Sequence, residues 1–479
     1  MLAYDVLRDL ERQVGRNHVY TRPSDLAAYA YDASGASGLR RVGDAVAFPA
    51  STAEVAGVIA ICAAHCVPVV PRGAGTGYAG GATADGGLIL NLSLMTRISG
   101  VDTEAERVAA EAGVITREIH RAATAAGLYY PPDPGSSSTS TIGGNVACNA
   151  AGPHALRYGA TADYVTGLTV VLADGRVVCL GEGGDAPQLL PLICGSEGTL
   201  AVVTEVVLRL VAAPAARATL AGTYDGVEAA AAAVAAISDA GIVPAALEFL
   251  DRPALDAIAA TGAGDVAPGA GALLIVEVEG TATEVNAHAE KVRATLSRAG
   301  SLTLDYATSA DEAARLWKLR KSVSAAVAKV QVGKVNEDVV VPRERVAELV
   351  TRSREIGAAN QLGVVNFGHL GDGTIHTTFL IDPRVSGERL RAAAAVEELF
   401  VAVLGLGGSL SGEHGVGTAK LGFVEHQLGS AQVALMRRVK HAFDPAGILN
   451  PGKKVPAETQ VPVEPPVAGA ALKTAAAAR

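Results

Sequence analysis

The amino-acid sequence predicts an α+β protein of two or three domains. Its 479 residues exceed the length at which one hydrophobic core usually divides into several. Around residues 44–92 strands and a helix alternate, which indicates that helices pack against a sheet. Beyond residues 212–219 (AAPAARAT) the pattern changes to strands separated by long helices. That succession is typical of an antiparallel sheet with helices over one face.

The predicted elements of the first half follow from apolar periodicity and turn residues. Thr52 is expected to cap a helix that ends near His65. Residues 131–135 (PPDPG) are too stiff for either regular structure, whereas residues 173–175 (ADG) form a hairpin turn. In chain order we expect a helix at 1–15, strands at 44–48, 67–70, 88–92 and 107–111, a helix at 116–126, a hairpin from 164–172 to 176–180 and a strand-rich run at 193–210.

The second half continues with the alternating pattern beyond residues 212–219. Glycine and aspartate in the turn at 371–373 (GDG) predict a hairpin around them. We expect strands at 219–224, 245–251 and 272–279, helices at 227–240, 283–299, 317–330 and 343–360, and the hairpin at 364–380.

Composition narrows the classes of function. Charged residues make up 19% of the chain and apolar residues 49%, as in soluble globular proteins. The 40 basic and 49 acidic residues give a net charge of −9, which argues against nucleic-acid binding. Residues 1–15 lack an apolar secretory core, and no later run has the length and hydropathy of a membrane-spanning helix. We therefore expect a cytoplasmic protein.

The five cysteines have no compact spacing pattern: Cys62, Cys66, Cys148, Cys179 and Cys194. Cys62 and Cys66 are expected to share one helix face, but a zinc site there lacks further ligands in the sequence. Free thiols in a reducing compartment are favoured.

Residues 71–81 (PRGAGTGYAGG) are the most informative stretch of the first half. Their glycines let a backbone approach a ligand closely, and successive exposed N–H groups suit a phosphate. A flexible surface turn is the alternative, but a second such stretch at 135–144 (GSSSTSTIGG) favours a large phosphate-bearing cofactor. The G-x-G-x-x-G spacing is weak evidence for a dinucleotide fold because a strand follows it, and no P-loop lysine closes the run.

A second constellation lies in residues 367–379 (FGHLGDGTIHTTF) and 407–417 (GGSLSGEHGVG). The hairpin would bring His369 and His376 together, and Glu413 and His414 stand between glycines downstream. Two histidines and a carboxylate form a plausible ligand set for a divalent metal; zinc, manganese or iron would suit it, with zinc or manganese favoured. Taken singly, each histidine is more often a surface or hydrogen-bonded core residue.

Two cationic residues complete the candidate site. Arg320 and Lys334 lie towards the two ends of a predicted helical stretch, and arginine binds a carboxylate with two parallel hydrogen bonds. A solvated helix face is the equally weighted alternative.

Six motifs in sequence order carry a resemblance to a known family: PRGAGTG (71–77), DPGSSSTSTIGGNVACNAAG (133–152), GSEGTLAVVTE (195–205), GHLGDGTIH (368–376), SGEHGVG (411–417) and FDPAGILNPGK (443–453). Over roughly residues 5–455 the chain resembles the FAD-linked oxidases of the vanillyl-alcohol-oxidase superfamily. Within it, the chain is most similar to the D-lactate, glycolate and D-2-hydroxyglutarate dehydrogenases.

The resemblance implies a two-subdomain PCMH-type FAD-binding domain at 1–213 and a substrate or cap domain at 214–424. A segment at 425–455 would return to the flavin. Independently of the resemblance, the Pro- and Ala-rich composition of 456–479 predicts a disordered tail. A dissociable, non-covalent FAD is expected, because Thr76 stands where many members carry the histidine that links the flavin.

The resemblance also assigns residues to the flavin. The pyrophosphate would be held by Arg72, Gly73, Ala74, Gly75, Thr76 and Gly77, and the flavin and ribityl chain by Pro132, Asp133, Pro134, Gly135, Ser136, Thr139, Thr141, Gly143, Gly144, Asn145 and Gly152. Glu197, Gly198 and Val203 would lie by the adenine or ribityl side, and Asn450 would touch the flavin region.

For the substrate, the resemblance implies that His369, His376 and Glu413 bind the metal and that His414 is the catalytic base. Arg320 and Lys334 would grip the substrate carboxylate with help from Ser324, whereas Thr378 replaces an asparagine often found in the family.

The expected reaction is oxidation of a D-2-hydroxy acid, with D-lactate or glycolate favoured over D-2-hydroxyglutarate. The proton would pass to His414 and the hydride to flavin N5. The electron acceptor would be a quinone, a cytochrome or an iron–sulfur subunit, and a homodimer is one open assembly. A metal hydrolase and a non-catalytic flavin-binding subunit of a larger oxidase are the alternatives.

Overall fold

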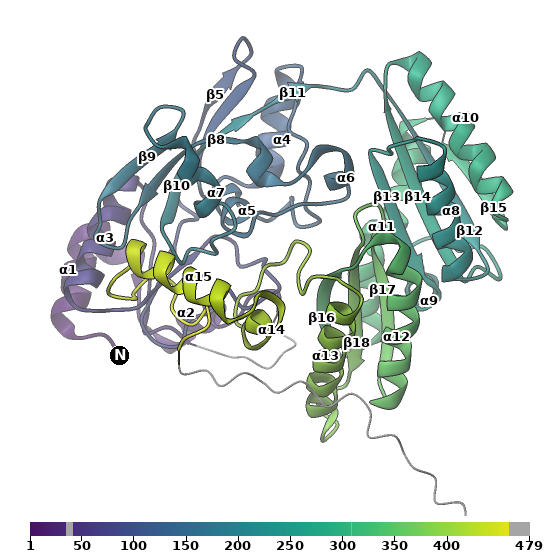
Figure 1. Cartoon of the computed structure of the whole chain (residues 1–479). Coiled ribbons are helices and arrows are strands. Elements are labelled where there is room, and N and C mark those ends of the chain that lie inside the picture. Colours follow the sequence, from purple (N-terminus) through teal and green to yellow (C-terminus); the bar gives the residue numbers. More distant parts are fainter. Residues whose placement is uncertain (35–41, 308, 459–479) are drawn as a thin grey trace, which may run out of the picture.

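The computed structural model describes residues 1–34, 42–307 and 309–458. Figure 1 shows two bodies side by side, residues 1–212 (purple to teal) on the left and residues 216–405 (teal to green) on the right. The yellow C-terminal helices at 424–443 return to the left body. Most of the predicted disordered tail, from residue 459 onward, lies outside the described residues.

The first body begins with a four-stranded sheet in the order β1-β2-β4-β3. β2 and β3 both run parallel to β4, as strand–helix–strand order requires. Leu10, Val55 and Leu88 are among the buried residues that pack the first helices against this sheet. The elements are α1 (Tyr4–Val14), η1 (Arg16–His18), β1 (Val19–Tyr20), α2 (Pro23–Leu26), η2 (Ala27–Tyr29), β2 (Ala45–Ala47), α3 (Thr52–Ala64), β3 (Val69–Arg72) and β4 (Leu88–Asn91).

The second sheet of this body is antiparallel, in the order β5-β6-β10-β8-β9. The hairpin predicted around residues 173–175 is confirmed as β8 and β9. A short pair, β7 and β11, leads to the second body. The elements are β5 (Ile98–Asp102), β6 (Arg107–Glu111), α4 (Thr116–Ala125), β7 (Leu128–Tyr129), α5 (Ile142–Cys148), α6 (Ala155–Tyr158), η4 (Thr161–Tyr164), β8 (Val165–Val171), β9 (Val177–Gly181), η5 (Pro187–Leu189), α7 (Leu190–Ile193), β10 (Val202–Arg209) and β11 (Val211–Ala212).

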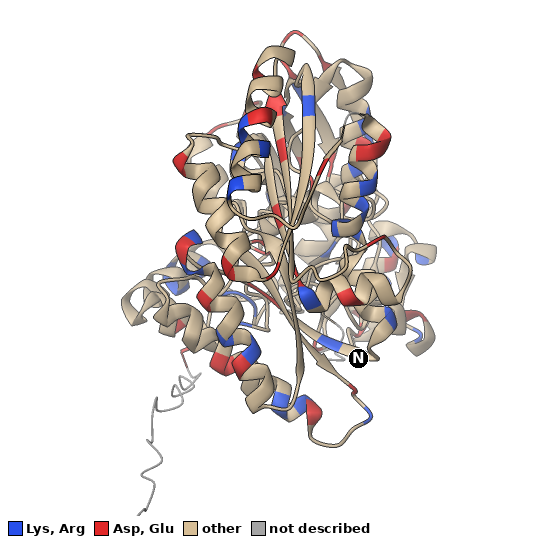
Figure 2. Cartoon of the chain, turned by 90° about the vertical axis from the view of Figure 1, so that its right-hand side faces the viewer, with Lys and Arg blue, Asp and Glu red and all other residues tan. Residues whose placement is uncertain are grey.

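The second body is built on a seven-stranded antiparallel sheet in the order β15-β12-β14-β13-β17-β18-β16. Figure 2 shows acidic and basic residues interspersed along the helices that flank this sheet. The elements are β12 (Ala216–Tyr224), α8 (Val227–Asp239), β13 (Ala246–Asp251), α9 (Arg252–Ala260), β14 (Ala272–Gly280), α10 (Ala282–Arg298), β15 (Thr303–Ala307), α11 (Ala310–Val330), β16 (Gly333–Val340), η6 (Arg343–Arg345), α12 (Val346–Ala359), β17 (Gly363–His369), β18 (Thr374–Ile381) and α13 (Glu388–Gly405).

Helices cover both faces of this sheet, whereas one covered face was predicted. Residues of α8, α10, α12 and α13 form one core against it, including Val285 and Leu399. On the other face α9 and α11 form a second core that includes Leu255 and Val323. Side chains alternate between the faces of a strand, so every second residue of β16, β17 and β18 is directed towards α11.

The C-terminal segment is bound to the first body. After η7 (Leu421–Phe423) come α14 (Val424–Leu428) and α15 (Ser430–Phe443), and Figure 1 shows α15 below the teal elements of the first body. The backbone N–H of Val69 donates to the carbonyl of Ile448 at 2.7 Å, and the N–H of Asn450 donates back to Val69 at 2.7 Å. Among the described residues, no helix combines the length and apolar character needed to cross a bilayer.

Three local predictions were wrong. Ser51, not Thr52, caps α3, because its hydroxyl accepts the N–H of Glu54 at 3.2 Å. α3 ends at Ala64, so Cys66 lies beyond the helix that it was expected to share with Cys62. The second glycine-rich stretch is a loop only in its first part, since Thr141 caps α5 and the residues after it are helical.

Candidate active site

A cavity of about 1600 Å³ lies between the two bodies. Its walls are formed by the glycine loop after β3, by the segment from β7 to α5, and by the face of the seven-stranded sheet that α11 covers. The volume exceeds that of a pocket for one drug-sized ligand, so a dinucleotide and a small substrate both have room.

Most of the residues predicted to bind the flavin line this cavity. They are residues 73–77, 133–136, Thr139, Thr141, Gly144, Asn145, Glu197 and Gly198. All seven predicted metal and substrate residues line it as well: Arg320, Ser324, Lys334, His369, His376, Glu413 and His414.

Six predicted flavin residues lie outside the cavity lining: Arg72, Pro132, Gly143, Gly152, Val203 and Asn450. The buried guanidinium of Arg72 donates to the carbonyls of Tyr31 and Ala82, and so supports the glycine loop from behind. The side chain of Val203 packs in the core of the second sheet.

The other four, Pro132, Gly143, Gly152 and Asn450, contact other parts of the protein. Asn450 donates to the carbonyls of Gly81 and Glu197 at 3.0 and 2.7 Å. A Cβ at Gly143 would meet Ala112, and one at Gly152 would meet the carbonyl of Asp133 at 2.6 Å. The carbonyl of Pro132 is 2.8 Å from Nε2 of His120.

Backbone geometry in the glycine loop fits a bound FAD. A Cβ at Gly73 would lie 2.1 Å from the Thr141 hydroxyl, so glycine lets the loop touch the start of α5. Gly77 and Gly135 line the cavity, and a Cβ at either would face open space. Side chains at these two positions would therefore project into the volume that the cofactor needs.

The predicted metal ligands converge from three segments. His369 ends β17 and His376 lies on β18, so the hairpin brings them together as predicted. Glu413 Oε1 lies 3.4 Å from Nε2 of each histidine. Their ligand atoms all fall within 4.8 Å of one another, and the buried Nδ1 of His376 has no hydrogen-bond partner in the described chain. This donor set fits zinc or manganese.

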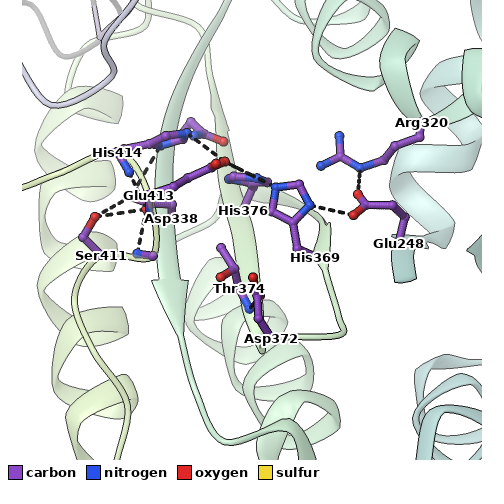
Figure 3. A network of polar contacts seen from close by, with 12 residues as sticks. Glu248, Arg320, Asp338, His369, Asp372, Thr374, His376, Ser411, Glu413 and His414 are labelled. Carbon is purple, nitrogen blue, oxygen red and sulfur yellow. Dashed lines mark hydrogen bonds and ion pairs between the residues drawn. The ribbon is translucent and has the colours of Figure 1, made fainter. Parts of the chain in front are cut away.

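Glu248 on β13 orients the first of these histidines (Figure 3). Its Oε1 lies 2.6 Å from Nδ1 of His369, and its Oε2 accepts from Nε of Arg320. A carboxylate on one ring nitrogen directs the other towards a metal. Burial alone would lower the pKa of His369, but the Glu248 carboxylate raises it well above its ordinary value.

The other two candidate ligands, His376 and Glu413, are held in the protonation states that bind a cation. Burial, reinforced by His414, lowers the pKa of His376 well below its ordinary value and keeps the ring neutral. Burial would raise the pKa of Glu413, but the hydrogen bond with His369 and the nearby imidazoles hold it at about 2. Neutral imidazole and ionised carboxylate are the forms that ligate metals.

Asp338 on β16 accepts hydrogen bonds from the loop that carries Glu413 and His414. Its Oδ2 accepts the backbone N–H groups of Gly412 and Glu413 at 2.8 and 2.7 Å, and Ser411 Oγ donates to it at 3.0 Å. The buried Lys420 ammonium pairs with its Oδ1. Burial would raise the pKa of Asp338, but Lys420 holds it far below its ordinary value.

The candidate base lies in a stack of rings. The ring of Tyr78, from the glycine loop, stacks on His414 at 4.7 Å, and His414 stacks on His376 at 5.1 Å. Nδ1 of His414 lies 3.4 Å from Asp338 Oδ1. Its Nε2 lies 3.7 Å from Glu413 Oε1, so the ring stands beside the candidate metal ligands.

Glu197 ties the base loop to the first body. Its carboxylate accepts the N–H groups of Val416 and Gly417 at 2.8 and 2.7 Å. The adenine or ribityl contact predicted for Glu197 stays a prediction, but this second role was not foreseen. The carbonyl of Ala79 likewise accepts the N–H of Thr418 at 2.9 Å.

A second acidic group in the cavity wall also joins the two bodies. His154 lies between Asp133 and Glu277, with Nδ1 2.9 Å and Nε2 3.0 Å from their carboxylates. Glu279 beside it pairs with Arg217 at 2.7 Å. Although His154, Glu277 and Glu279 are close enough to share an ion, the arginine supplies the positive charge, so we assign a network of ion pairs.

The sequence contains a signal for some of the site residues that were not predicted. Glu248 interrupts the apolar strand of β13, and Glu277 and Glu279 interrupt that of β14 at a spacing that directs both to one face. A carboxylate inside an apolar strand is costly unless it is paired. Glu277 lines the cavity, whereas Glu248 and Glu279 pair with His369 and Arg217. Tyr78 lay within the glycine stretch itself.

Comparisons with known proteins show the family of this chain. The family model "FAD linked oxidases, C-terminal domain" matches residues 213–454, and "FAD binding domain" matches residues 43–181. The glycolate oxidase subunit GlcD of Bacillus subtilis is 38% identical over 95% of this chain and 97% of its own. A D-lactate dehydrogenase of Anaerostipes hadrus is 35% identical over 84% and 87%. The solved 4-ethylphenol oxidase of Gulosibacter chungangensis superimposes with a TM-score of 0.80 over 95% and 97% at 19% identity, which confirms the predicted fold class.

Proposed function

Because this chain belongs to the FAD-linked oxidases and is an FAD-binding oxidoreductase, we propose that it oxidises a small D-2-hydroxy acid, D-lactate or glycolate, to the 2-oxo acid. One observation carries the proposal. The carboxylate-binding cations, the candidate base and the metal-ligand trio line the same cavity as the glycine loop. A substrate there lies within reach of all four parts.

The substrate carboxylate is held by Arg320 and Lys334. Nε of Arg320 is occupied by Glu248, which leaves its two terminal nitrogens for the substrate. The ammonium of Lys334 donates to the Ser324 carbonyl at 3.3 Å, and burial lowers its pKa. Ser324 thereby contributes through its backbone, and its predicted hydroxyl contact stays a prediction.

The proton of the substrate hydroxyl passes to the imidazole of His414, whose Nδ1 faces Asp338 and whose Nε2 faces Glu413. His369, His376 and Glu413 would hold a divalent cation, zinc or manganese, beside that hydroxyl. Bound FAD would supply the acceptor for the hydride from the substrate Cα, and a bound cation would stabilise the negative charge that develops on the hydroxyl oxygen.

D-2-Hydroxyglutarate is the second candidate substrate. Its far carboxylate needs another cation, and Lys321, exposed on α11, lines the cavity. One relative is named as a subunit, so we further propose that electrons leave to a quinone, a cytochrome or an iron–sulfur subunit. A cytoplasmic location stays part of the proposal.

Anaerobic bleaching of the flavin tests the proposal. FAD-loaded protein is mixed with glycolate, D-lactate, L-lactate or D-2-hydroxyglutarate, and the flavin absorbance is followed. We expect rapid bleaching by D-lactate or glycolate and none by L-lactate. His414→Ala should keep FAD but slow reduction by about 10²- to 10⁴-fold. A colourless protein, or a flavin that no 2-hydroxy acid reduces, would overturn the proposal.

A further inference from the structure

One asparagine in the cavity wall has no part in the proposed mechanism. Asn336 lies on β16, two residues from Lys334 and two from Asp338. Because side chains alternate along a strand, all three face α11. The strand register places Asn336 opposite Thr378 and Asp338 opposite His376. Asn336 therefore stands between the lysine and the candidate metal centre, and it lines the cavity.

The neighbouring strand holds this amide in one orientation. Thr378 Oγ1 donates to Asn336 Oδ1 at 2.7 Å. Thr378 is 1% exposed, and its branched side chain has few rotamers. With Oδ1 engaged, the amide presents its Nδ2 donors, and no group among the described residues accepts from them.

Two cationic donors, Lys334 and Arg320, line the same cavity as Asn336. The ammonium of Lys334 uses one of its three N–H donors on the Ser324 carbonyl. Glu248 accepts from Nε of Arg320 and not from its two terminal nitrogens. An amide N–H pair, an ammonium and a guanidinium together suit a planar anion with two oxygens, each of which accepts more than one hydrogen bond.

We infer that Asn336, held in place by Thr378, donates a hydrogen bond to the substrate carboxylate and is a third binding residue beside Arg320 and Lys334. The identity of the anion rests on the proposed function. The neutral amide adds direction without adding charge, so it fixes the orientation of the carboxylate and with it the position of Cα.

Propionate, which is lactate without its hydroxyl group, tests the inference because it cannot be oxidised at C2. Its dissociation constant is measured on FAD-loaded protein from the change in flavin absorbance. Asn336→Ala should bind propionate about 10- to 100-fold more weakly, as expected for a lost hydrogen bond to a charged group. Asn336→Asp should bind propionate more weakly still, because the new aspartate carboxylate would repel the carboxylate of propionate. Thr378→Val should weaken binding about 3- to 10-fold by releasing the amide.

The chain offers a matched control on the same strand. Thr377 Oγ1 donates to Asn366 Oδ1 at 3.0 Å, and both residues are fully buried on the opposite face of the sheet, where Ser353 of α12 also contacts Asn366. Thr377→Val removes a hydrogen bond of the same kind. It should lower the melting temperature about as much as Thr378→Val while changing the propionate constant less than about twofold.

Three results would overturn the inference: no propionate binding by the wild type, an unchanged constant in Asn336→Ala, or equal weakening in the two threonine variants. The proposed function is judged separately. If propionate binds as expected but no 2-hydroxy acid bleaches the flavin, the oxidation is wrong and the anion site stands.

Discussion

Oδ2 of Asp338 accepts the backbone N–H of His414 at 2.9 Å. With the N–H groups of Gly412 and Glu413, three successive backbone donors surround one carboxylate oxygen, a geometry typical of anion-binding loops. Here the anion is a side chain of the protein. The position of the candidate base and of one candidate metal ligand therefore depends on a single buried carboxylate and on the Lys420 ammonium that neutralises it.

Asp338→Asn should weaken metal binding and slow flavin reduction. An amide keeps the size of the carboxylate but directs N–H donors either at the loop or at Lys420. Loss of such an outer partner typically costs about 10- to 100-fold, and an uncompensated buried ammonium costs about 3–5 kcal/mol of stability. Metal titration, stopped-flow reduction and thermal unfolding measure these effects.

The double variant Asp338→Asn with Lys420→Met provides the control. Methionine removes the buried charge, so the amide nitrogen no longer faces an ammonium while its oxygen can still accept the loop N–H groups. We expect most of the lost stability to return. If the two substitutions simply add, the ion pair is not what holds the loop.

Glu413→Gln should abolish stoichiometric metal binding. The wild type is expected to retain about one zinc or manganese ion per chain, as measured by elemental analysis after dialysis. Glu248→Gln should have a milder effect, about 10- to 100-fold in metal affinity, because Glu248 contacts His369 rather than the ion. His65→Ala, at an exposed histidine, serves as the control. Equal metal content in all four proteins would contradict the site.

The flavin should be released by acid precipitation. Thr76 has no imidazole to form a covalent link, and the ring nitrogens of His154 both face carboxylates. The supernatant after trichloroacetic acid treatment should be yellow and the pellet colourless. Flavin fluorescence that stays with the denatured chain on a gel would show a covalent bond instead.

The ion pairs of His154 should make stability depend on pH. Burial would lower its pKa, but Asp133 and Glu277 raise it to about 10, above the ordinary value of 6.5. A raised folded-state pKa stabilises the fold fully below about pH 6.5, and this contribution is lost as the pH rises through 10. The His154→Gln variant should therefore have a lower melting temperature than the wild type at pH 6.5, and this difference in melting temperature should shrink towards pH 10. A gap that does not change with pH would rule out the charged imidazole.

Much of the site could be predicted because its signals are local. The turn at 371–373 joins β17 to β18, and that alone brings His369 near His376. Glycines in residues 73–81 permit close backbone approach wherever the loop lies. Glu413 and His414 are adjacent in the chain, so one loop carries both.

Other features of the site could not be predicted, because they depend on contacts that the local sequence pattern does not reveal. The capping of α5 by Thr141 turned the last part of a predicted loop, residues 142–144, into a helix. The hydroxyl that accepts the N–H of Gly144 outweighs the low helix propensity of glycine. Arg72 turned away from the cavity because two carbonyls behind the loop compensate its buried charge.

The sequence by itself determined the order of the elements, the glycine loops, the hairpin and the identity of the residues that could carry the chemistry. The tertiary structure alone decided that Glu248 meets His369 and that Asn336 meets Thr378. The reason is strand register. β13 pairs with β17, and β16 with β18, across long intervening segments, and a register between distant strands is set by how both faces of the whole sheet are buried.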